Sequence, residues 1–264
     1  MHDESLRLLL RTLRLPSVLG RYRELADTAR AQAWSHEQYL HALAETECQD
    51  RVSRRVERLL GGSGLPPGKS LATLDMEALP PRIGPLLGQL LGGEFVRQAR
   101  NVLLFGLPGR GKSHLAAALG REMIVRHGFR VLFVGAFALV QRLLAAKAAL
   151  RVDAELARLD RFDLVILDDI GYVQQSRDEM EVLFAFLGER YERRSLVITS
   201  NLVFSQWDRI FKDAMTTAAA VDRLVHHADI VELNQTESYR APRPGGPKAR
   251  ARQESKPSPP AAEP

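Results

Sequence analysis

The chain has 264 residues, which allows one large or two modest domains, and its hydrophobic content of 45% is sufficient for a full core. No apolar stretch approaches the roughly 20 residues that a membrane-spanning helix needs, and the N-terminus lacks the basic segment of a signal peptide, so we expect a cytoplasmic protein without a membrane partner. The single cysteine, Cys48, excludes intrachain disulfides and multi-thiolate zinc sites. The net charge of +5 comes mostly from residues 240–264, which is typical either of a nucleic-acid-binding tail or of a solubilising one.

Three regions follow one another along the chain. Apolar residues first recur at helical spacing, and residues 35–38 (Ser-His-Glu-Gln) form a capping-box signature. Residues 61–68 read G-G-S-G-L-P-P-G, which breaks any helix and is typical of a linker. We therefore expect a helical DNA- or partner-binding region with its linker at 1–68, an α/β domain at 69–240 and a disordered, basic, Pro-rich tail at 241–264.

The middle region alternates between short apolar runs and helical patterns. The runs predict strands at 101–105, 131–134, 164–167, 195–199 and 229–233. The helical patterns predict helices near 112–127, 136–149, 177–193, 204–211 and 217–227. Such alternation is typical of an α/β fold in which helices cover both faces of a parallel sheet, and ligands of such sheets bind beyond the carboxyl ends of the strands.

A phosphate-binding motif follows the first of these strands. Residues 106–113 read G-L-P-G-R-G-K-S, which matches G-x-x-x-x-G-K-S, between a buried strand and a helix that starts at Lys112. The glycines let backbone N–H groups approach phosphate oxygens, Lys112 reaches the β- and γ-phosphates, and the Ser113 hydroxyl holds Mg²⁺. The sequence therefore predicts that ATP and Mg²⁺ bind to a loop made of Gly106, Leu107, Pro108, Gly109, Arg110, Gly111, Lys112, Ser113 and His114.

Two aspartates follow the strand predicted at 164–167. Asp168 is expected to hold Mg²⁺, directly or through water, opposite Ser113, as a Walker B aspartate does. Asp169 is the candidate that orients or deprotonates the attacking water. Paired aspartates also occur as helix caps or turns, but their position downstream of the phosphate-binding loop favours the catalytic interpretation.

Two further polar positions are candidates for a role in ATP hydrolysis. Asn201 follows the strand at 195–199, where a polar side chain can contact the γ-phosphate or its water, although Thr, Ser and Asn are also common turn residues. Arg223 lies near the end of a helix just before the last strand. A single arginine is by default a surface residue, and this one can alternatively reach the γ-phosphate of a neighbouring subunit and stabilise charge in the transition state.

Candidate DNA-binding residues form one stripe in the N-terminal region. Four arginines fall at i, i+3, i+4 and i+7, on one helical face: Arg51, Arg54, Arg55 and Arg58. Such a stripe either lines a phosphate backbone or forms a solvated helix face. No residue pattern for reading base edges is present, so we expect sequence-tolerant binding.

The motifs in their order carry a family resemblance. The segments GLPGRGKSHLA, LVILDDIGY, ERYERRSLVITSN, FSQWDRIFKD and DRLVHHADIVELNQTESYR are similar to those of the IstB-like insertion-sequence transposition helper ATPases. These proteins belong to the AAA+ branch that includes the DnaC-type helicase loaders. The resemblance covers residues 90–240 closely and the N-terminal region more loosely. It implies a P-loop AAA+ sheet preceded by a small helical domain. By the same resemblance the Walker A loop contains Gly106, Gly111, Lys112 and Ser113, and the Walker B motif contains Asp168 and Asp169. Asn201 matches the sensor position, and Arg223 matches the arginine finger.

Three departures from the family pattern bear on activity. Thr236 stands where the family usually has a glycine before E-S-Y-R, and the short Pro-rich stretch after Leu233 predicts that a C-terminal helical lid is absent. Asp169 stands where many AAA+ proteins have Glu. Its shorter side chain predicts slow hydrolysis, which suits a timer or a switch.

The function that this resemblance implies is an ATP-dependent helper of a cognate transposase. We expect an ATPase that assembles on double-stranded DNA as an ATP-dependent homo-oligomer and stimulates transposition. A DnaC-like helicase loader shares every nucleotide-site motif, and a scaffold that uses ATP only to join subunits is compatible with Asp169. A small P-loop kinase would need an acceptor pocket and a mobile lid. A dinucleotide-binding oxidoreductase is disfavoured because the third glycine of G-x-G-x-x-G is absent after Gly109 and Gly111.

Overall fold

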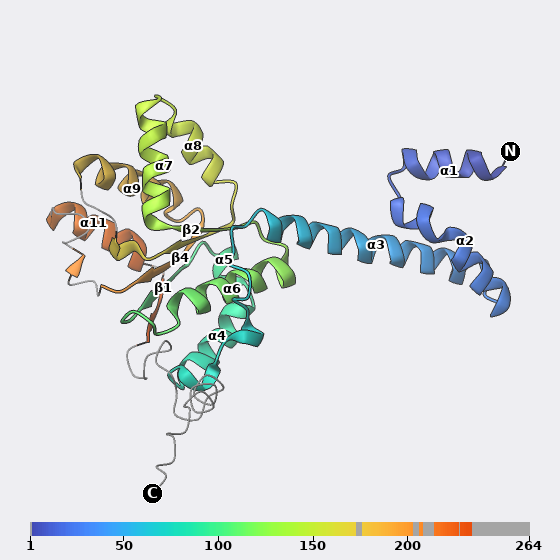
Figure 1. The fold of residues 1–264 in the computed structure, drawn as a ribbon, viewed down its shortest axis with the longest axis horizontal. Coiled ribbons are helices and arrows are strands. Elements are labelled where there is room, and N and C mark those ends of the chain that lie inside the picture. The colour runs from blue at the N-terminus through green and yellow to red at the C-terminus, as the bar shows by residue number, and fades with distance from the viewer. Residues whose placement is uncertain (1, 173–175, 203–205, 208–213, 227, 234–264) are drawn as a thin grey trace, which may run out of the picture.

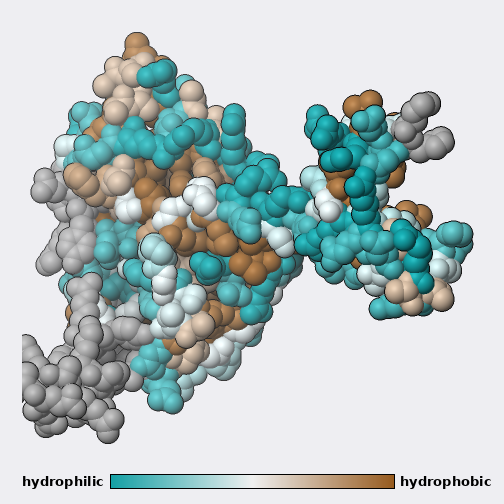
Figure 2. Space-filling model, turned by 45° about the vertical axis from the view of Figure 1, so that its right-hand side comes forward, coloured by the Kyte–Doolittle hydropathy of each residue, from teal (hydrophilic) through white to brown (hydrophobic). Residues whose placement is uncertain are grey.

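The computed structural model describes residues 2–172, 176–202, 206–207, 214–226 and 228–233. Figure 1 shows a helical arm and an α/β core that are connected by one long helix, α3. In Figure 2 the arm stands clear of the core as a separate lobe. The arm consists of α1 (His2–Thr12), α2 (Pro16–Ala31) and α3 (His36–Gly61).

Local sequence signals determine where helices of the arm begin. The Ser35 side chain accepts a hydrogen bond from the N–H of Gln38, which confirms the predicted capping box at the start of α3. Helix α2 begins with Pro16, whose missing N–H is no loss in the first turn. Leu10, Val18 and Leu43 bring the three helices together in a small apolar core.

The core is built on one parallel sheet of five strands in the order β2-β3-β4-β1-β5. The strands are β1 (Asn101–Phe105), β2 (Val131–Gly135), β3 (Leu164–Asp168), β4 (Ser195–Ser200) and β5 (Ala228–Glu232). Every residue of β1 and β4 is buried, because both strands lie in the interior of the sheet. The structure thus confirms the α/β fold class and all five predicted strands, with bounds that differ by at most one residue.

Alternate residues of each strand face two separate apolar clusters. Val102 and Leu104 face the cluster under α4 (Ile83–Leu91), α5 (Glu94–Arg97) and α6 (Lys112–His127). Leu103 and Phe105 face the cluster under α7 (Ala136–Ala148), α8 (Val152–Leu159), α9 (Arg177–Arg190) and α11 (Ala214–Val225). Figure 1 shows these two groups of helices on opposite faces of the sheet. The remaining helical turns are η1 (Leu71–Thr73), η2 (Met76–Ala78) and η3 (Ile170–Tyr172).

Several helices differ from the sequence prediction. Helices α4, α5 and α8 were not predicted, since α4 contains Gly and Pro and the other two are short. Helix α9 ends at Arg190, before the predicted bound, because Tyr191 leaves the helical conformation with a ψ of 126° and Glu192 after it has a positive φ of 56°. Of the helix predicted at 204–211 the structure describes only residues 206–207, and the tail at 241–264 lies outside the described residues. Among those described, no helix combines the length and the apolar character that crossing a membrane requires.

Candidate nucleotide-binding site

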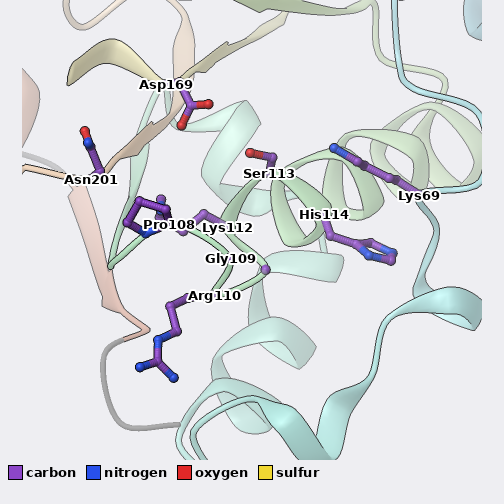
Figure 3. A pocket seen from close by; sticks show the side chains of 10 residues that line it. Lys69, Pro108, Gly109, Arg110, Lys112, Ser113, His114, Asp169 and Asn201 are labelled. Atoms are coloured by element: carbon purple, nitrogen blue, oxygen red, sulfur yellow. The ribbon is translucent and has the colours of Figure 1, made fainter. Parts of the chain in front are cut away.

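A glycine-rich loop joins β1 to α6 at the carboxyl edge of the sheet. Gly109 and Gly111 have φ values of +81° and +84°, a conformation that residues with a Cβ rarely adopt. A cavity of about 330 Å³ opens beside the loop, which is within the range of small-molecule sites (Figure 3). It is lined by Lys69, Pro108, Gly109, Arg110, Gly111, Lys112, Ser113, His114, Asp169 and Asn201.

The Lys112 side chain lies inside the loop and is buried. Its Nζ donates to the carbonyl oxygens of Gly106 at 2.6 Å and of Leu107 at 3.0 Å. These carbonyls compensate for the removal of the ammonium group from water. Gly106 and Leu107 therefore hold Lys112 in place and are not themselves among the lining residues.

The charge of the cavity wall suits a polyphosphate. Lys69, Arg110 and Lys112 are positive, whereas Asp169 is the one carboxylate among the described lining residues. The N-terminus of α6, a helix of 16 residues, adds positive potential at Lys112 and Ser113. The residues present therefore fit the phosphates of a nucleotide.

One buried hydroxyl connects the two aspartates. Thr199, at the end of β4, donates to Oδ1 of Asp168 at 2.7 Å and accepts the backbone N–H of Asp169 at 2.8 Å. Asp169 has a φ of +57°, which turns its side chain toward the cavity, whereas Asp168 is not among the lining residues. The hydrogen bond from Thr199 fixes the orientation of the Asp168 carboxyl group, and carboxylate oxygens are ligands that Mg²⁺ prefers. The sequence analysis did not assign Thr199 a role of its own.

Asn201 reaches the cavity from the loop after β4. Its Oδ1 is buried next to Gly171 and has no hydrogen-bond partner among the described residues. A Cβ on Gly171, in η3, would overlap this oxygen. Gly171 therefore makes room for Asn201, a role that no local sequence signal indicated.

Arg223 does not line the cavity of its own chain. Its guanidinium lies over the ring of Phe184 in α9, 4.3 Å from the ring centroid. A Cβ on Gly188 would lie 3.0 Å from Nη1 of Arg223. Phe184 and Gly188 thus position Arg223 on the surface formed by α9 and α11.

The structure gives the four arginines of the predicted DNA-binding stripe intramolecular partners. Arg51 and Arg54 each contact Oε1 of the buried Glu47 at 3.2 Å. The other carboxylate oxygen of Glu47 accepts the N–H groups of Ser17 and Val18 at the start of α2. Two further bonds run from Arg55 to the carbonyl of Gly128 and from Arg58 to that of Arg54. Arg51 and Arg54 therefore connect α3 to α2 within the arm. Contact of the stripe with DNA stays a prediction.

The fold and this site define the class of the protein. A P-loop on a parallel sheet of order β2-β3-β4-β1-β5, with paired aspartates where β3 ends, is the AAA+ type of P-loop fold. The crystal structure of the DnaC helicase loader is similar, with a TM-score of 0.50 and 17% identity over 57% of this chain and 88% of that one. The chain belongs to the family of IstB-like ATP binding proteins, whose family model matches residues 8–244.

Two relatives from insertion sequences cover nearly the same length. An insertion sequence ATP-binding protein of Sinorhizobium fredii is 45% identical over 90% of this chain and 80% of its own length. The insertion sequence IS21 ATP-binding protein of Pseudomonas aeruginosa is 34% identical over 91% of this chain and 89% of its own. The family resemblance inferred from the ordered motifs is confirmed.

Proposed function

We propose that this protein is the helper ATPase of an insertion-sequence transposase, which binds ATP with Mg²⁺ and assembles on double-stranded DNA. The observation that carries the proposal is the convergence of Lys112, Ser113, Asp169 and Asn201 on one cavity. The names of the relatives support it, because they describe ATP-binding proteins of insertion sequences.

The side chains of the cavity have separate roles in ATP hydrolysis. Lys112 and the loop N–H groups bind the phosphates. Ser113 and Asp168 hold Mg²⁺, which neutralises phosphate charge when it is bound. Asp169 orients the attacking water and accepts its proton, and Asn201 positions that water or the γ-phosphate. Because the Asp169 side chain is short, hydrolysis is slow.

Arg223 supports the proposed self-association. It lies outside the cavity of its own chain, half-buried between α9 and α11, so its role in hydrolysis requires a second subunit. In an oligomer it reaches the γ-phosphate of the neighbouring subunit and stabilises the charge of the transition state. ATP binding and assembly are then coupled, since the nucleotide lies between subunits.

The arm and its arginines are the proposed DNA contact, and the cognate transposase is the proposed protein partner. The second candidate function is a scaffold in which ATP joins subunits without hydrolysis, which the short Asp169 favours. Release of phosphate from the purified protein separates the two, because only the helper ATPase releases it. A helicase loader would bind a replicative helicase instead of the transposase in a pull-down.

The first experiment is light scattering of the full chain with and without double-stranded DNA, in ATP, in ADP and without nucleotide. DNA-bound oligomers that form only with ATP are expected. Lys112→Ala should lose ATP binding and assembly together, whereas Asp169→Ala should bind ATP and remain assembled. A monomer under every condition would overturn the proposal and favour a P-loop phosphotransferase.

A further inference from the structure

A lysine from outside the P-loop reaches the candidate nucleotide cavity. Lys69 lies between α3 and η1, and it lines the cavity together with Ser113 and Asp169. Figure 3 shows the Lys69 ammonium and the Asp169 carboxylate extending from opposite sides toward Ser113. The side chain is half-buried, and it forms no ion pair with any of the residues that the structure describes.

The segment before Lys69 is attached to the sheet. The carbonyl of Ser63, a buried residue, accepts the N–H of Phe133 in β2 at 2.7 Å. Gly64 has a φ of +69°, and a Cβ there would lie only 2.7 Å from the Phe133 carbonyl oxygen. The chain therefore leaves the end of α3 in a fixed path along β2.

The segment after Lys69 is attached to the helix that follows the P-loop. Nε2 of His114 lies 3.1 Å from the carbonyl oxygen of Ser70 and 3.1 Å from Oγ1 of Thr73. The Thr73 hydroxyl also donates to the carbonyl of Gly68 at 2.6 Å. Because His114 directly follows Ser113 in the first turn of α6, these bonds hold the backbone of Lys69 beside the cavity.

We propose that Lys69 is a nucleotide-binding residue whose ammonium group pairs with phosphate oxygens, and that this contact transmits the nucleotide state to the arm. The inference rests on the proposed ATP binding. An ammonium is a compact point charge, and its attraction to a phosphate is strong where the surroundings exclude water. Lys69 lies close in sequence to the end of α3, the long helix of the arm in Figure 1. A nucleotide that binds Lys69 therefore adds a further contact to the segment that connects core and arm.

The first test is calorimetric titration of ATP into the full chain. Lys69→Met removes the charge at similar length and should weaken ATP binding about ten- to a hundredfold, the range for hydrogen bonds to charged groups. Lys69→Arg retains the charge and should bind within about threefold of the wild type. Lys147→Met is the matched control, because Lys147 pairs with Asp178 and Glu181 on the surface, away from the cavity. An equal loss in Lys69→Met and Lys69→Arg would assign the effect to linker folding and overturn the inference.

The second test is hydrogen exchange of the amides in residues 62–73, with and without ATP. ATP should slow their exchange in the wild type and in Lys69→Arg, and should not slow it in Lys69→Met. If Lys69→Met binds ATP as the wild type does, Lys69 is not a nucleotide-binding residue and the inference is overturned, although ATP-dependent assembly on DNA would still support the proposed function. If ATP binding depends on Lys69 but the protein does not assemble on DNA, only the proposed function is overturned.

Discussion

The hydroxyl of Thr199 lies 2.7 Å from Oδ1 of Asp168, across the boundary between the neighbouring strands β3 and β4. The same hydroxyl accepts the N–H of Asp169, so one side chain fixes both the proposed Mg²⁺ ligand and the backbone of the proposed catalytic aspartate. A threonine hydroxyl can do both at once, because it is a donor and an acceptor.

Replacement of Thr199 by Val should therefore impair hydrolysis more than ATP binding. Val retains the shape but leaves the N–H of Asp169 unpaired, at a cost of about 1–3 kcal/mol, and releases the carboxylate of Asp168. We expect the rate of phosphate release to fall roughly tenfold or more, in proportion to that cost, while the Kd for ATP changes little. Thr199→Ser restores the hydroxyl and should recover most of the rate. Equal rates for the Val and Ser variants would show that the hydroxyl has no positioning role.

A second prediction concerns the space that Gly171 leaves for Asn201. Gly171→Ala places a methyl group where Oδ1 of Asn201 now lies, so it should displace that side chain and lower the rate of hydrolysis as much as Asn201→Ala does. Since both substitutions remove the same interaction, the double variant should be no slower than either single one. Gly88→Ala is the control, because its Cβ would meet no atom within 4 Å. Additive losses in the double variant would contradict the proposed link.

The sequence predicted best those parts of the candidate site whose residues are contiguous in the chain. The apolar strand, the G-x-x-x-x-G-K-S loop and the helix start at Lys112 are contiguous, so their spacing alone predicted the phosphate-binding loop. Asn201 was predicted because it follows a strand, and the structure places it at the cavity. The roles of Thr199, Gly171 and Lys69 depend on which strands are neighbours and on where the linker runs, and spacing along the chain contains neither.

The arginine stripe shows a different limit of sequence reasoning. Helical spacing correctly placed four arginines on α3, but it could not show that Glu47, one turn earlier, is buried and binds two of them. Arg54→Ala should therefore lower the free energy of unfolding of the arm, by about 1–3 kcal/mol, because it removes a charged hydrogen-bond partner of a buried carboxylate. The measurement is thermal or urea unfolding followed by circular dichroism.

Arg58 offers the complementary test of DNA binding, since it is exposed and its bond to the Arg54 carbonyl is long, at 3.4 Å. Arg58→Ala should weaken DNA binding without lowering stability, and should reduce the slope of log K against log salt by about 1. An unchanged slope would place the DNA contact elsewhere on the protein.

Arg190 is predicted to stabilise the core without acting in the site. It is 1% exposed and donates to the carbonyls of Leu159, Phe162 and Ser195 at 3.0–3.1 Å. Burial lowers the pKa of Arg190 to about 10, which leaves the guanidinium charged at neutral pH.

Arg190→Met would leave three carbonyl groups without this donor and should lower the free energy of unfolding by about 3–5 kcal/mol. Arg193→Met is the control, because its side chain is 57% exposed and its ion pairs contribute about 1 kcal/mol at most. Urea unfolding measures both. A loss of less than about 1 kcal/mol in Arg190→Met would show that water replaces the guanidinium at these carbonyls.

Arg223 is predicted to act in the nucleotide site of a neighbouring subunit. Its position over Phe184, away from its own cavity, requires that it complete a site on another chain if it takes part in hydrolysis at all. Arg223→Ala and Asp169→Ala should therefore each be inactive alone, but a mixture of the two should regain activity. In the mixture, an intact site on an Arg223→Ala subunit can meet an intact Arg223 on an Asp169→Ala subunit.

The measurement is phosphate release at a fixed total concentration, with DNA present, as the ratio of the two variants is changed. Activity should be highest near equal amounts, because the productive contact needs one subunit of each kind. Phe184→Ala should act like a weaker form of Arg223→Ala, since it removes only the surface on which the guanidinium lies. A mixture that stays inactive at every ratio, from two variants that still assemble with ATP, would show that Arg223 does not act between subunits.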